Sequence, residues 1–196
     1  MKKLNKRGFT LIELLAVIVI LAVLLAIAIP AVAKYINSSK KETYVENAQS
    51  YAKAARSEAL LGTYQFPISQ NDAVVVSFKA LEDALENGGK ESSYGNEFED
   101  NNSFVVIINT GDGTNPKNEY YIAACDKKGY SIGITSGDSS SQAIVSYDAL
   151  KKDNIMQFSN CSSAPTIPTK TGDSYGTLEL ADGKTANVVN VVTSLK

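Results

Sequence analysis

The 196-residue chain contains no histidine and no tryptophan, and it has only two cysteines. Without imidazole it cannot build a Ser-His-Asp triad, a Cys-His dyad or a histidine-ligated metal site. Two cysteines are too few for a zinc ribbon, and neither a phosphate-binding loop nor a dinucleotide fingerprint occurs. We therefore expect no cofactor, no metal and no catalytic residue. A carboxylate hydrolase is the enzymatic alternative, but spacing marks out no pair of acidic residues.

The chain also lacks an excess of positive charge, because 19 Lys and Arg residues face 21 Asp and Glu residues, giving a net charge of −2. This balance argues against a nucleic-acid partner, which usually requires a basic surface. The length suits one domain with an appendage. The charge is unevenly distributed, since ten basic and seventeen acidic residues follow Gly62. The two parts of the chain are therefore interpreted separately.

The amino terminus combines a basic segment with a long apolar run. Residues 1–8 hold four basic side chains and no acidic one, and no charged residue occurs from Leu14 to Ala33. This run is long enough for a helix to cross about 30 Å of hydrocarbon. Because basic residues stay on the cytoplasmic side during insertion, we expect a single membrane span with the amino terminus in the cytoplasm.

Two general interpretations of this segment compete with a more specific one. A plain membrane anchor explains the length and the flanking charge but gives no reason for Glu13 near its start. A secretory signal explains the basic start and the apolar run, and Ala31-Val32-Ala33 offers a cleavage site. However, the run exceeds the apolar region of about 7 to 15 residues in such signals. A helical pattern also continues beyond the cleavage site, which favours a third interpretation.

The segment Lys6-Arg7-Gly8-Phe9-Thr10-Leu11-Ile12-Glu13 resembles the processing signature of type IV pilins and the related pseudopilins. In that family a prepilin peptidase cuts on the cytoplasmic side after the glycine and methylates the new amino-terminal phenylalanine. The resemblance assigns these positions to Gly8 and Phe9. The family also has a glutamate at the fifth position after the cut and a helix-kinking proline at the twenty-second, and both are present as Glu13 and Pro30.

Glu13 is unusual in a membrane segment, because a carboxylate in lipid is costly unless it is paired or protonated. The resemblance implies that its partner is the amine freed at Phe9 of a neighbouring subunit. Such a charge pair would set the axial register of the growing fibre. The alternative, from the residue alone, is that Glu13 reaches the nearby membrane interface.

The helical pattern continues to Leu61, and Gly62 follows as a stop signal. We divide this helix into a membrane and polymerisation half, 9–33, and an amphipathic half, 34–61. Pro30 predicts a kink or local melting just before it. Small residues of the second half recur at steps of three and four, which predicts packing against a sheet. They are Val45, Ala48, Ala52, Ala55 and Ala59. Once extracted from lipid, the first half needs a cover, which copies of the same helix would supply.

Residues 62–196 are predicted to form an extracellular globular domain. A short helix is predicted from Ser77 to Asn87, and Asp182-Gly183 indicates a hairpin with a two-residue turn. The segment Ser146–Asn154 fits either a strand end or a helical turn. The Ser-, Thr- and Pro-rich segment 159–176 is expected to be irregular.

Three further short strands are predicted in this domain. They are Phe104–Asn109, Tyr120–Cys125 and Tyr130–Thr135. In the last one, Tyr130, Ile132 and Ile134 are expected on a single face. The short connections favour antiparallel pairing. The predicted fold class is therefore α+β, with a long amino-terminal helix packed on an antiparallel sheet, similar to the ladle shape of type IV pilins.

Cys125 and Cys161 lie in the part of the chain that such an anchor places outside the cell, where disulfides persist. A bridge between them would close a loop of about 37 residues and stabilise the domain by about 3 to 4 kcal/mol. Members of the family often have a disulfide-bounded loop in this region, though frequently nearer to the carboxyl terminus. Two free, buried thiols are the alternative.

These features predict a structural subunit of a type IV pilus that serves adhesion, twitching motility or another surface contact. The resemblance implies that the protein is anchored in the bacterial cytoplasmic membrane before assembly and is part of an extracellular pilus fibre afterwards. The resemblance implies four partners: a prepilin peptidase, a membrane platform protein, an assembly ATPase, and further pilin copies in a helical homo-oligomer. The alternatives are a pseudopilin of a type II secretion or competence system, and a membrane-anchored adhesive binding module.

Overall fold

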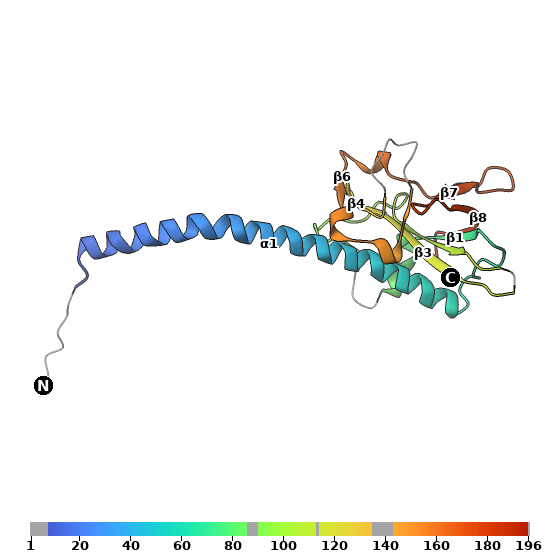
Figure 1. Ribbon diagram of the computed structural model, residues 1–196, viewed down its shortest axis with the longest axis horizontal. Helices are drawn as coiled ribbons and strands as arrows, with labels where there is room; N and C mark the ends of the chain where they lie inside the picture. The colour runs from blue at the N-terminus through green and yellow to red at the C-terminus, as the bar shows by residue number, and fades with distance from the viewer. Residues whose placement is uncertain (1–7, 86–89, 113, 135–142, 196) are drawn as a thin grey trace, which may run out of the picture. The chain divides into compact units, whose positions relative to one another are not determined.

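The computed structural model of the chain describes residues 8–85, 90–112, 114–134 and 143–195 (Figure 1). The chain forms two compact units, residues 1–39 and residues 40–196. The helices are α1 (Leu11–Leu60) and α2 (Phe78–Leu81), with 3-10 turns η1 (Glu82–Ala84), η2 (Tyr147–Ala149), η3 (Lys152–Asn154) and η4 (Cys161–Ser163). The strands are β1 (Asp72–Ser77), β2 (Phe104–Asn109), β3 (Asn118–Cys125), β4 (Tyr130–Ile132), β5 (Val145–Ser146), β6 (Met156–Gln157), β7 (Thr177–Glu179) and β8 (Thr185–Val192).

The part of α1 in the first unit is apolar and uncovered. Its most apolar window of 18 residues has a mean hydropathy of 3.2, and none of that window is buried. By length and composition this helix can span a membrane. The α-helix continues through Pro30 without interruption, so the local melting expected there is not found. A kink without melting stays a prediction.

The part of α1 in the second unit buries the predicted face of small residues. The four alanines of that face are buried, and Val45 is partly buried against them. Tyr44 and Tyr51 are also buried, and the ring of Tyr51 stacks on Phe78 of α2 with a centroid distance of 3.7 Å. The small residues thus let the helix approach the sheet, while two tyrosines outside the predicted pattern fill the remaining space.

The end of α1 is a Schellman motif at the predicted stop. Gly62 has a positive φ of 84°, and its N–H donates to the carbonyl of Ala59 at 3.1 Å. The N–H of Thr63 donates to the carbonyl of Glu58, also at 3.1 Å. These two bonds satisfy carbonyls that the helix leaves open at its end, and glycine adopts the required left-handed conformation at low cost.

An eight-stranded sheet forms the body of the second unit, in the order β6-β4-β3-β2-β1-β8-β7, with β5 beside β3. The pairs are antiparallel except for β1 and β8, which run parallel. The α+β class is confirmed, but the sheet is mixed rather than antiparallel. Strand β1 lies inside the sheet between β2 and β8 and is not among the predicted strands, although four consecutive small apolar residues, Ala73 to Val76, form its middle.

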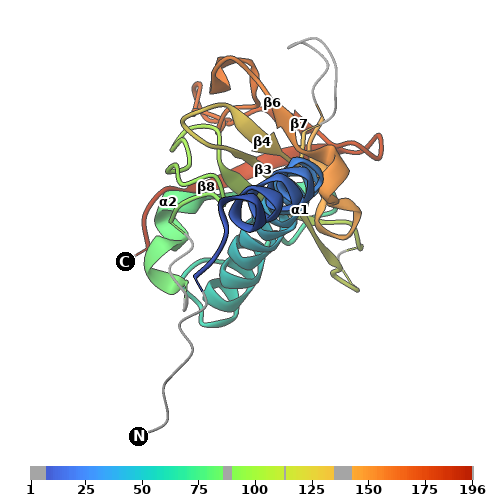
Figure 2. The same ribbon diagram turned by 90° about the vertical axis from the view of Figure 1, so that its left-hand side faces the viewer.

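The sheet curls so far that segments from its two sides meet. Strand β5 pairs with β3, and the residue before it, Ile144, pairs with Leu180 just beyond β7. The N–H of Ile144 donates to the carbonyl of Glu179 at 3.0 Å, and its carbonyl accepts from the N–H of Ala181 at 2.9 Å. Because β5 and Ile144 bridge β3 to the end of β7, the strands enclose an apolar interior. Figure 2 shows the same elements turned by 90°.

The curled sheet carries an apolar cluster on each face. Along β2, Val105 and Ile107 pack in the cluster beneath α1, whereas Phe104, Val106 and Ile108 pack in the cluster inside the curled sheet. This alternation follows from the two-residue period of a strand. A strand buried on both faces has a continuous apolar sequence, which explains why this segment shows no polar alternation.

The predicted common face of the third strand is wrong at its end. Tyr130 and Ile132 pack with the cluster beneath α1, but Ile134 packs with the inner cluster. Gly133 lies between them with a φ of 78°, which breaks the alternation after β4. Its backbone lies so close to the neighbouring strand that an added Cβ would be 1.7 Å from the carbonyl oxygen of Ile122.

The other predicted elements are present with altered bounds. The predicted helix at Ser77 is the short α2 followed by η1, and its predicted end, like Thr135, lies outside the described residues. The segment Ser146–Asn154 contains both alternatives, a strand end and two 3-10 turns. The hairpin between β7 and β8 is confirmed, but its loop has three residues, because the N–H of Leu180 donates to the carbonyl of Lys184 at 2.9 Å.

Candidate functional site

The first turn of α1 is closed by a reciprocal pair of side chains. The backbone N–H of Thr10 donates to Oε2 of Glu13 at 2.8 Å, and the hydroxyl of Thr10 donates to the same oxygen at 2.7 Å. The backbone N–H of Glu13 donates in turn to the hydroxyl oxygen of Thr10 at 3.3 Å. This arrangement is a capping box, in which a threonine and a glutamate three residues later satisfy each other's backbone donors.

The capping box gives Glu13 a local role that the predicted charge pair and the interfacial alternative did not include. The sequence signal for it, threonine followed three residues later by glutamate before an apolar run, is present in the chain. One oxygen of the carboxylate accepts both bonds from Thr10. The other oxygen accepts no hydrogen bond within the described residues, so it is the part of Glu13 that another chain can approach.

The predicted cleavage site precedes the helix. Gly8 and Phe9 are non-helical, and the side chain of Phe9 is 83% exposed. Apart from its two neighbours in the chain, no atom of the described residues lies within 4 Å of the position that a Cβ on Gly8 would occupy. The backbone around the Gly8–Phe9 bond is therefore outside regular structure and unobstructed, as a peptidase requires of its substrate.

The helix that follows this site has apolar side chains on all sides. They include Leu14, Leu15, Val17, Ile18, Val19, Ile20, Leu21, Val23, Leu24, Leu25, Ile27 and Ile29, each of them exposed in this single chain. Such a surface far exceeds the small apolar patches of soluble monomers. It therefore requires either lipid or other protein as its surroundings.

In the second unit, Cys125 and Cys161 form a disulfide, with a Cα–Cα distance of 5.9 Å. Cys125 is the last residue of β3, and Cys161 begins the 3-10 turn η4 in the segment rich in Ser, Thr and Pro. The bridge therefore holds this irregular segment against the end of a core strand. It closes a loop between residues 36 positions apart, which restricts the unfolded chain.

The residue after this cysteine, Asp126, is a fully buried carboxylate with local partners. Its Oδ1 accepts the backbone N–H groups of Lys128 at 2.9 Å and Tyr130 at 3.0 Å. Its Oδ2 accepts the hydroxyl of Ser92 at 2.7 Å. A buried carboxylate needs such donors, and here they close the turn between β3 and β4. We therefore assign Asp126 to the fold rather than to a reaction.

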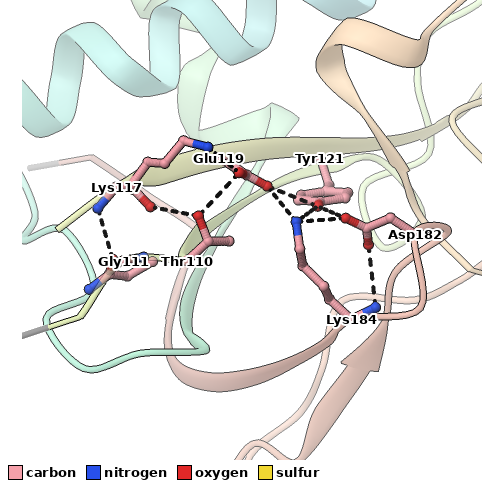
Figure 3. Close-up of polar contacts among 8 residues, drawn as sticks. Thr110, Gly111, Lys117, Glu119, Tyr121, Asp182 and Lys184 are labelled. Atoms are coloured by element: carbon pink, nitrogen blue, oxygen red, sulfur yellow. Dashed lines mark hydrogen bonds and ion pairs between the residues drawn. The ribbon is translucent and has the colours of Figure 1, made fainter.

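A network of charged side chains connects β3 to the hairpin between β7 and β8 (Figure 3). Glu119 pairs through one oxygen with Lys117 at 2.9 Å and through the other with Lys184 at 2.7 Å. Lys184 also pairs with Asp182 at 2.7 Å, and Asp182 accepts the hydroxyl of Tyr121 at 2.7 Å. Strands β3 and β8 are separated by two strands in the sheet order, so this contact requires the sheet to curl.

The network holds both of its carboxylates in the ionised form. Hydrogen bonds from Lys184 and Lys117 lower the pKa of Glu119 to about 2. Desolvation opposes ionisation of Asp182, but its hydrogen bonds with Lys184 and Tyr121 lower its pKa. Hydrogen bonds to Asp182 and Glu119 raise the pKa of Lys184. Since each charge has a partner, the network is suited to holding the hairpin in place, and general acid catalysis would require a proton that these carboxylates lack.

The amino-terminal segment matches a known family description. A family model described as the prokaryotic N-terminal methylation motif matches residues 3–29. The amino terminus therefore carries the prokaryotic methylation motif. This match supports the type IV pilin and prepilin family indicated by the resemblance, and it contains Gly8, Phe9 and Glu13. No curated protein and no solved structure matches the chain.

The predicted processing and assembly residues all lie in the first unit, whereas the predicted disulfide lies in the second. Gly8 and Phe9 precede α1, Glu13 caps its first turn, and Pro30 lies inside it. The motif and the exposed apolar helix together suit a protein that is anchored in a membrane and then assembled. Pairing of Glu13 with the amine of another copy involves a second chain and stays a prediction, as do cleavage and methylation.

Proposed function

We propose that the chain is a structural subunit of a type IV pilus. In this proposal it inserts with its amino terminus in the cytoplasm and is cleaved after Gly8. Its new terminus, Phe9, is then methylated, and the mature chain enters a helical fibre. One combined observation supports this proposal most strongly. The methylation motif is followed by an apolar helix, and the most hydrophobic window of that helix is entirely exposed.

The energetics of this helix favour association with copies of itself. Full burial of a Leu, Ile or Val side chain is worth about 1.5 to 3 kcal/mol. Covering about ten of the exposed side chains would therefore contribute roughly 15 kcal/mol or more, which matches or exceeds the estimated cost of about 4 to 15 kcal/mol for immobilising a partner. Identical helices offer the same apolar surface on every copy, so one contact can repeat along a fibre.

The free oxygen of Glu13 supports the proposed register of this contact. Cleavage after Gly8 creates an amine at Phe9, and an amine paired with a carboxylate is far less costly in an apolar fibre core than either group alone. Because Thr10 already fixes the direction of the Glu13 side chain, the carboxylate is oriented before assembly. The pair would then favour one axial offset between neighbouring subunits.

The motif also supports the proposed partners. A prepilin-type signal implies a prepilin peptidase, and a fibre drawn from a membrane implies a platform protein, an energy source such as an assembly ATPase, and other pilin copies. In this proposal the protein is a substrate and a building block rather than an enzyme. Adhesion or motility would then depend on the outer surface of the second unit.

The mass and amino-terminal sequence of the mature chain test the proposal directly. We expect a chain that begins with N-methylated phenylalanine at residue 9. A chain that begins at residue 34 would contradict the proposal and indicate ordinary secretion. Immunogold labelling of the native cells supplies the second test, because a major pilin labels the whole length of surface fibres. Labelling restricted to the envelope would instead favour a pseudopilin or an anchored binding module.

A further inference from the structure

The second unit has a groove of about 560 Å³ beside α1. One wall holds Lys53 and Arg56 on the exposed side of α1, and another holds Tyr147 and Asp148 of η2. Lys117 and the first residues of β3, Asn118 to Tyr121, also line the groove. Three separate elements of the fold therefore bring cationic, anionic and aromatic side chains to one concave surface, as ligand sites do.

Several polar groups of this groove have no partner within the described chain. The charged groups of Lys53, Arg56 and Asp148 form no hydrogen bond or ion pair there, although carboxylates and amines line the same groove. The Oδ1 atom of Asn118 is buried and accepts no hydrogen bond among the described residues. By contrast, both carboxylate oxygens of Glu119 already pair with Lys117 and Lys184. The groove thus offers unused donors and acceptors of both kinds.

A second hollow adjoins the groove at Tyr120. This hollow of about 280 Å³ shares Arg56, Asn118 and Tyr120 with the first, and it adds the apolar side chains of Leu60 and Phe66. Arg56 and Tyr120 line both hollows, so the guanidinium and the phenol border the same part of this surface. An extended ligand can therefore pass over an aromatic ring and a guanidinium and place an apolar group beyond them.

We propose that this groove binds a short acidic saccharide. A saccharide offers many hydroxyl donors and acceptors together with apolar C–H faces, which complement the unpaired polar groups and the rings of Tyr120 and Tyr147. Two unpaired cations, Lys53 and Arg56, outnumber the unpaired carboxylate of Asp148, which favours a ligand that carries a carboxylate. The guanidinium can hold a carboxylate through two parallel hydrogen bonds.

Other ligand classes fit these walls less well. The groove holds as many acidic as basic side chains, and acidic residues are in excess after Gly62, so the repeated charges of a polyphosphate such as a nucleic acid are opposed more strongly than the single carboxylate of a saccharide unit. A lipid tail would leave the charged groups of both walls desolvated without partners. The groove lies entirely in the second unit, so its binding can be measured on the single chain, separately from processing and assembly.

The test uses the full-length chain in mild detergent and two saccharides of equal length. A hyaluronan tetrasaccharide supplies carboxylates, and chitotetraose is the neutral counterpart. Titration is followed by NMR of tyrosine ring signals and backbone amides. We expect hyaluronan to shift signals of Tyr120 and Tyr147 at concentrations below about 10 mM, with chitotetraose binding at least about tenfold more weakly. Added salt should weaken the hyaluronan binding.

Variants assign the binding to the groove. Arg56→Gln should weaken hyaluronan binding about tenfold or more, because it removes a charge-assisted pair, and Tyr147→Leu should weaken it by removing an aromatic surface. Lys128→Gln is the matched control, since Lys128 is exposed and lies outside the groove. Unchanged backbone spectra of the free variants show that they fold. Equal binding of both saccharides, no binding of either, or binding that neither groove variant weakens would overturn the proposal.

Discussion

Glu119 shows how one side chain can fix the position of a distant segment. It accepts bonds from Lys117 on its own strand and from Lys184, which is 65 residues away in the sequence. Its side chain is only 26% exposed, so water screens these pairs less than it screens the exposed pair of Lys79 and Asp100. The network is therefore more than a surface ion pair, and its contribution to stability should depend on pH.

Replacing Glu119 by Gln should reduce the acid sensitivity of the fold. The folded pKa of Glu119 is about 2, below the ordinary value of a glutamate, so the folded state favours the ionised form. The stabilisation is therefore complete above about pH 4.5 and is lost as the pH falls toward 2. Glu119→Gln should lower the free energy of unfolding by about 1 to 2 kcal/mol at neutral pH and flatten its decline between those values.

Urea unfolding of the full chain in mild detergent, followed by near-ultraviolet circular dichroism at a series of pH values, measures this effect. Glu46→Gln is the control, because Glu46 is exposed on α1 and forms no ion pair within the described residues. We expect its pH profile to resemble that of the unmodified protein. A Glu119→Gln profile with the same slope between pH 4.5 and 2 would show that the network does not stabilise the fold.

Secondary-structure elements with a strong local signal were predicted well from the sequence. The strand Phe104–Asn109 has its predicted bounds, and α1 ends within a residue of its predicted end because Gly62 carries its own stop signal. The parallel place of β8 next to β1 and the closure of the sheet through Ile144 could not be predicted, since both depend on contacts between distant segments. The ion network depends on that closure, so it could not be predicted from the sequence either.

Two other features, strand β1 and the capping box, were not predicted although the sequence contains a signal for each. The run from Ala73 to Val76 is short and apolar and is bounded by polar residues, which is typical of a strand buried on both faces. The spacing of Thr10 and Glu13 is that of a capping box. The false prediction of a common face for Tyr130, Ile132 and Ile134 ignored Gly133, although a glycine within a strand pattern often marks a break in alternation.

Gly133 and Gly62 provide a matched test of how each glycine shapes its element. Both have positive φ values, of 78° and 84°. An added Cβ at Gly133 would be 1.7 Å from the carbonyl oxygen of Ile122. Apart from the two chain neighbours of Gly62, no atom of the described residues would lie within 4 Å of an added Cβ there. Gly62→Ala should therefore cost about 1 kcal/mol for backbone strain alone, and Gly133→Ala about 3 kcal/mol or more, because the strands must also separate.

Thermal and urea unfolding of the two alanine variants compares these costs. Destabilisation by Gly133→Ala should also weaken the protection of Val145 from hydrogen exchange, since the N–H of Val145 donates to the carbonyl of Gly133 at 2.8 Å. Equal stability of the two variants would contradict the close strand contact at Gly133.

At the scale of the whole molecule, the two units have separate requirements: the second needs internal stability, and the first needs an apolar environment. The second unit folds around its own apolar clusters and is tied together by the disulfide, the charged network and the curled sheet. The first unit buries none of its most apolar window and depends on its surroundings. Stability of the second unit and assembly through the first should therefore respond to different substitutions.

Replacing both Cys125 and Cys161 by Ser tests what stabilises the second unit. The bridge joins residues 36 positions apart, so its loss should lower the free energy of unfolding of the second unit by about 3 to 4 kcal/mol. Urea unfolding at pH 7 measures this change, and the unmodified chain treated with a reductant is the matched comparison. Cleavage after Gly8 should continue at its usual rate, because that site lies in the other unit. Unaltered stability of the double variant would contradict a structural role for the bridge.

Substitutions of Glu13 test assembly through the first unit. Its carboxylate has two roles to separate, the capping box with Thr10 and the proposed pair with the amine of Phe9. Glu13→Ala removes both the capping box and the charge, whereas Glu13→Gln keeps an oxygen that can accept from Thr10 and removes only the charge. If the amine of Phe9 in a neighbouring subunit pairs with this carboxylate, both variants should be cleaved after Gly8 but yield few fibres. If Glu13 serves only as a cap, Gln should restore the fibre yield that Ala loses. Immunoblots of sheared fibres and of the membrane fraction separate these outcomes. Normal yields from Glu13→Gln would exclude the charge pair as the device that sets the register of the fibre.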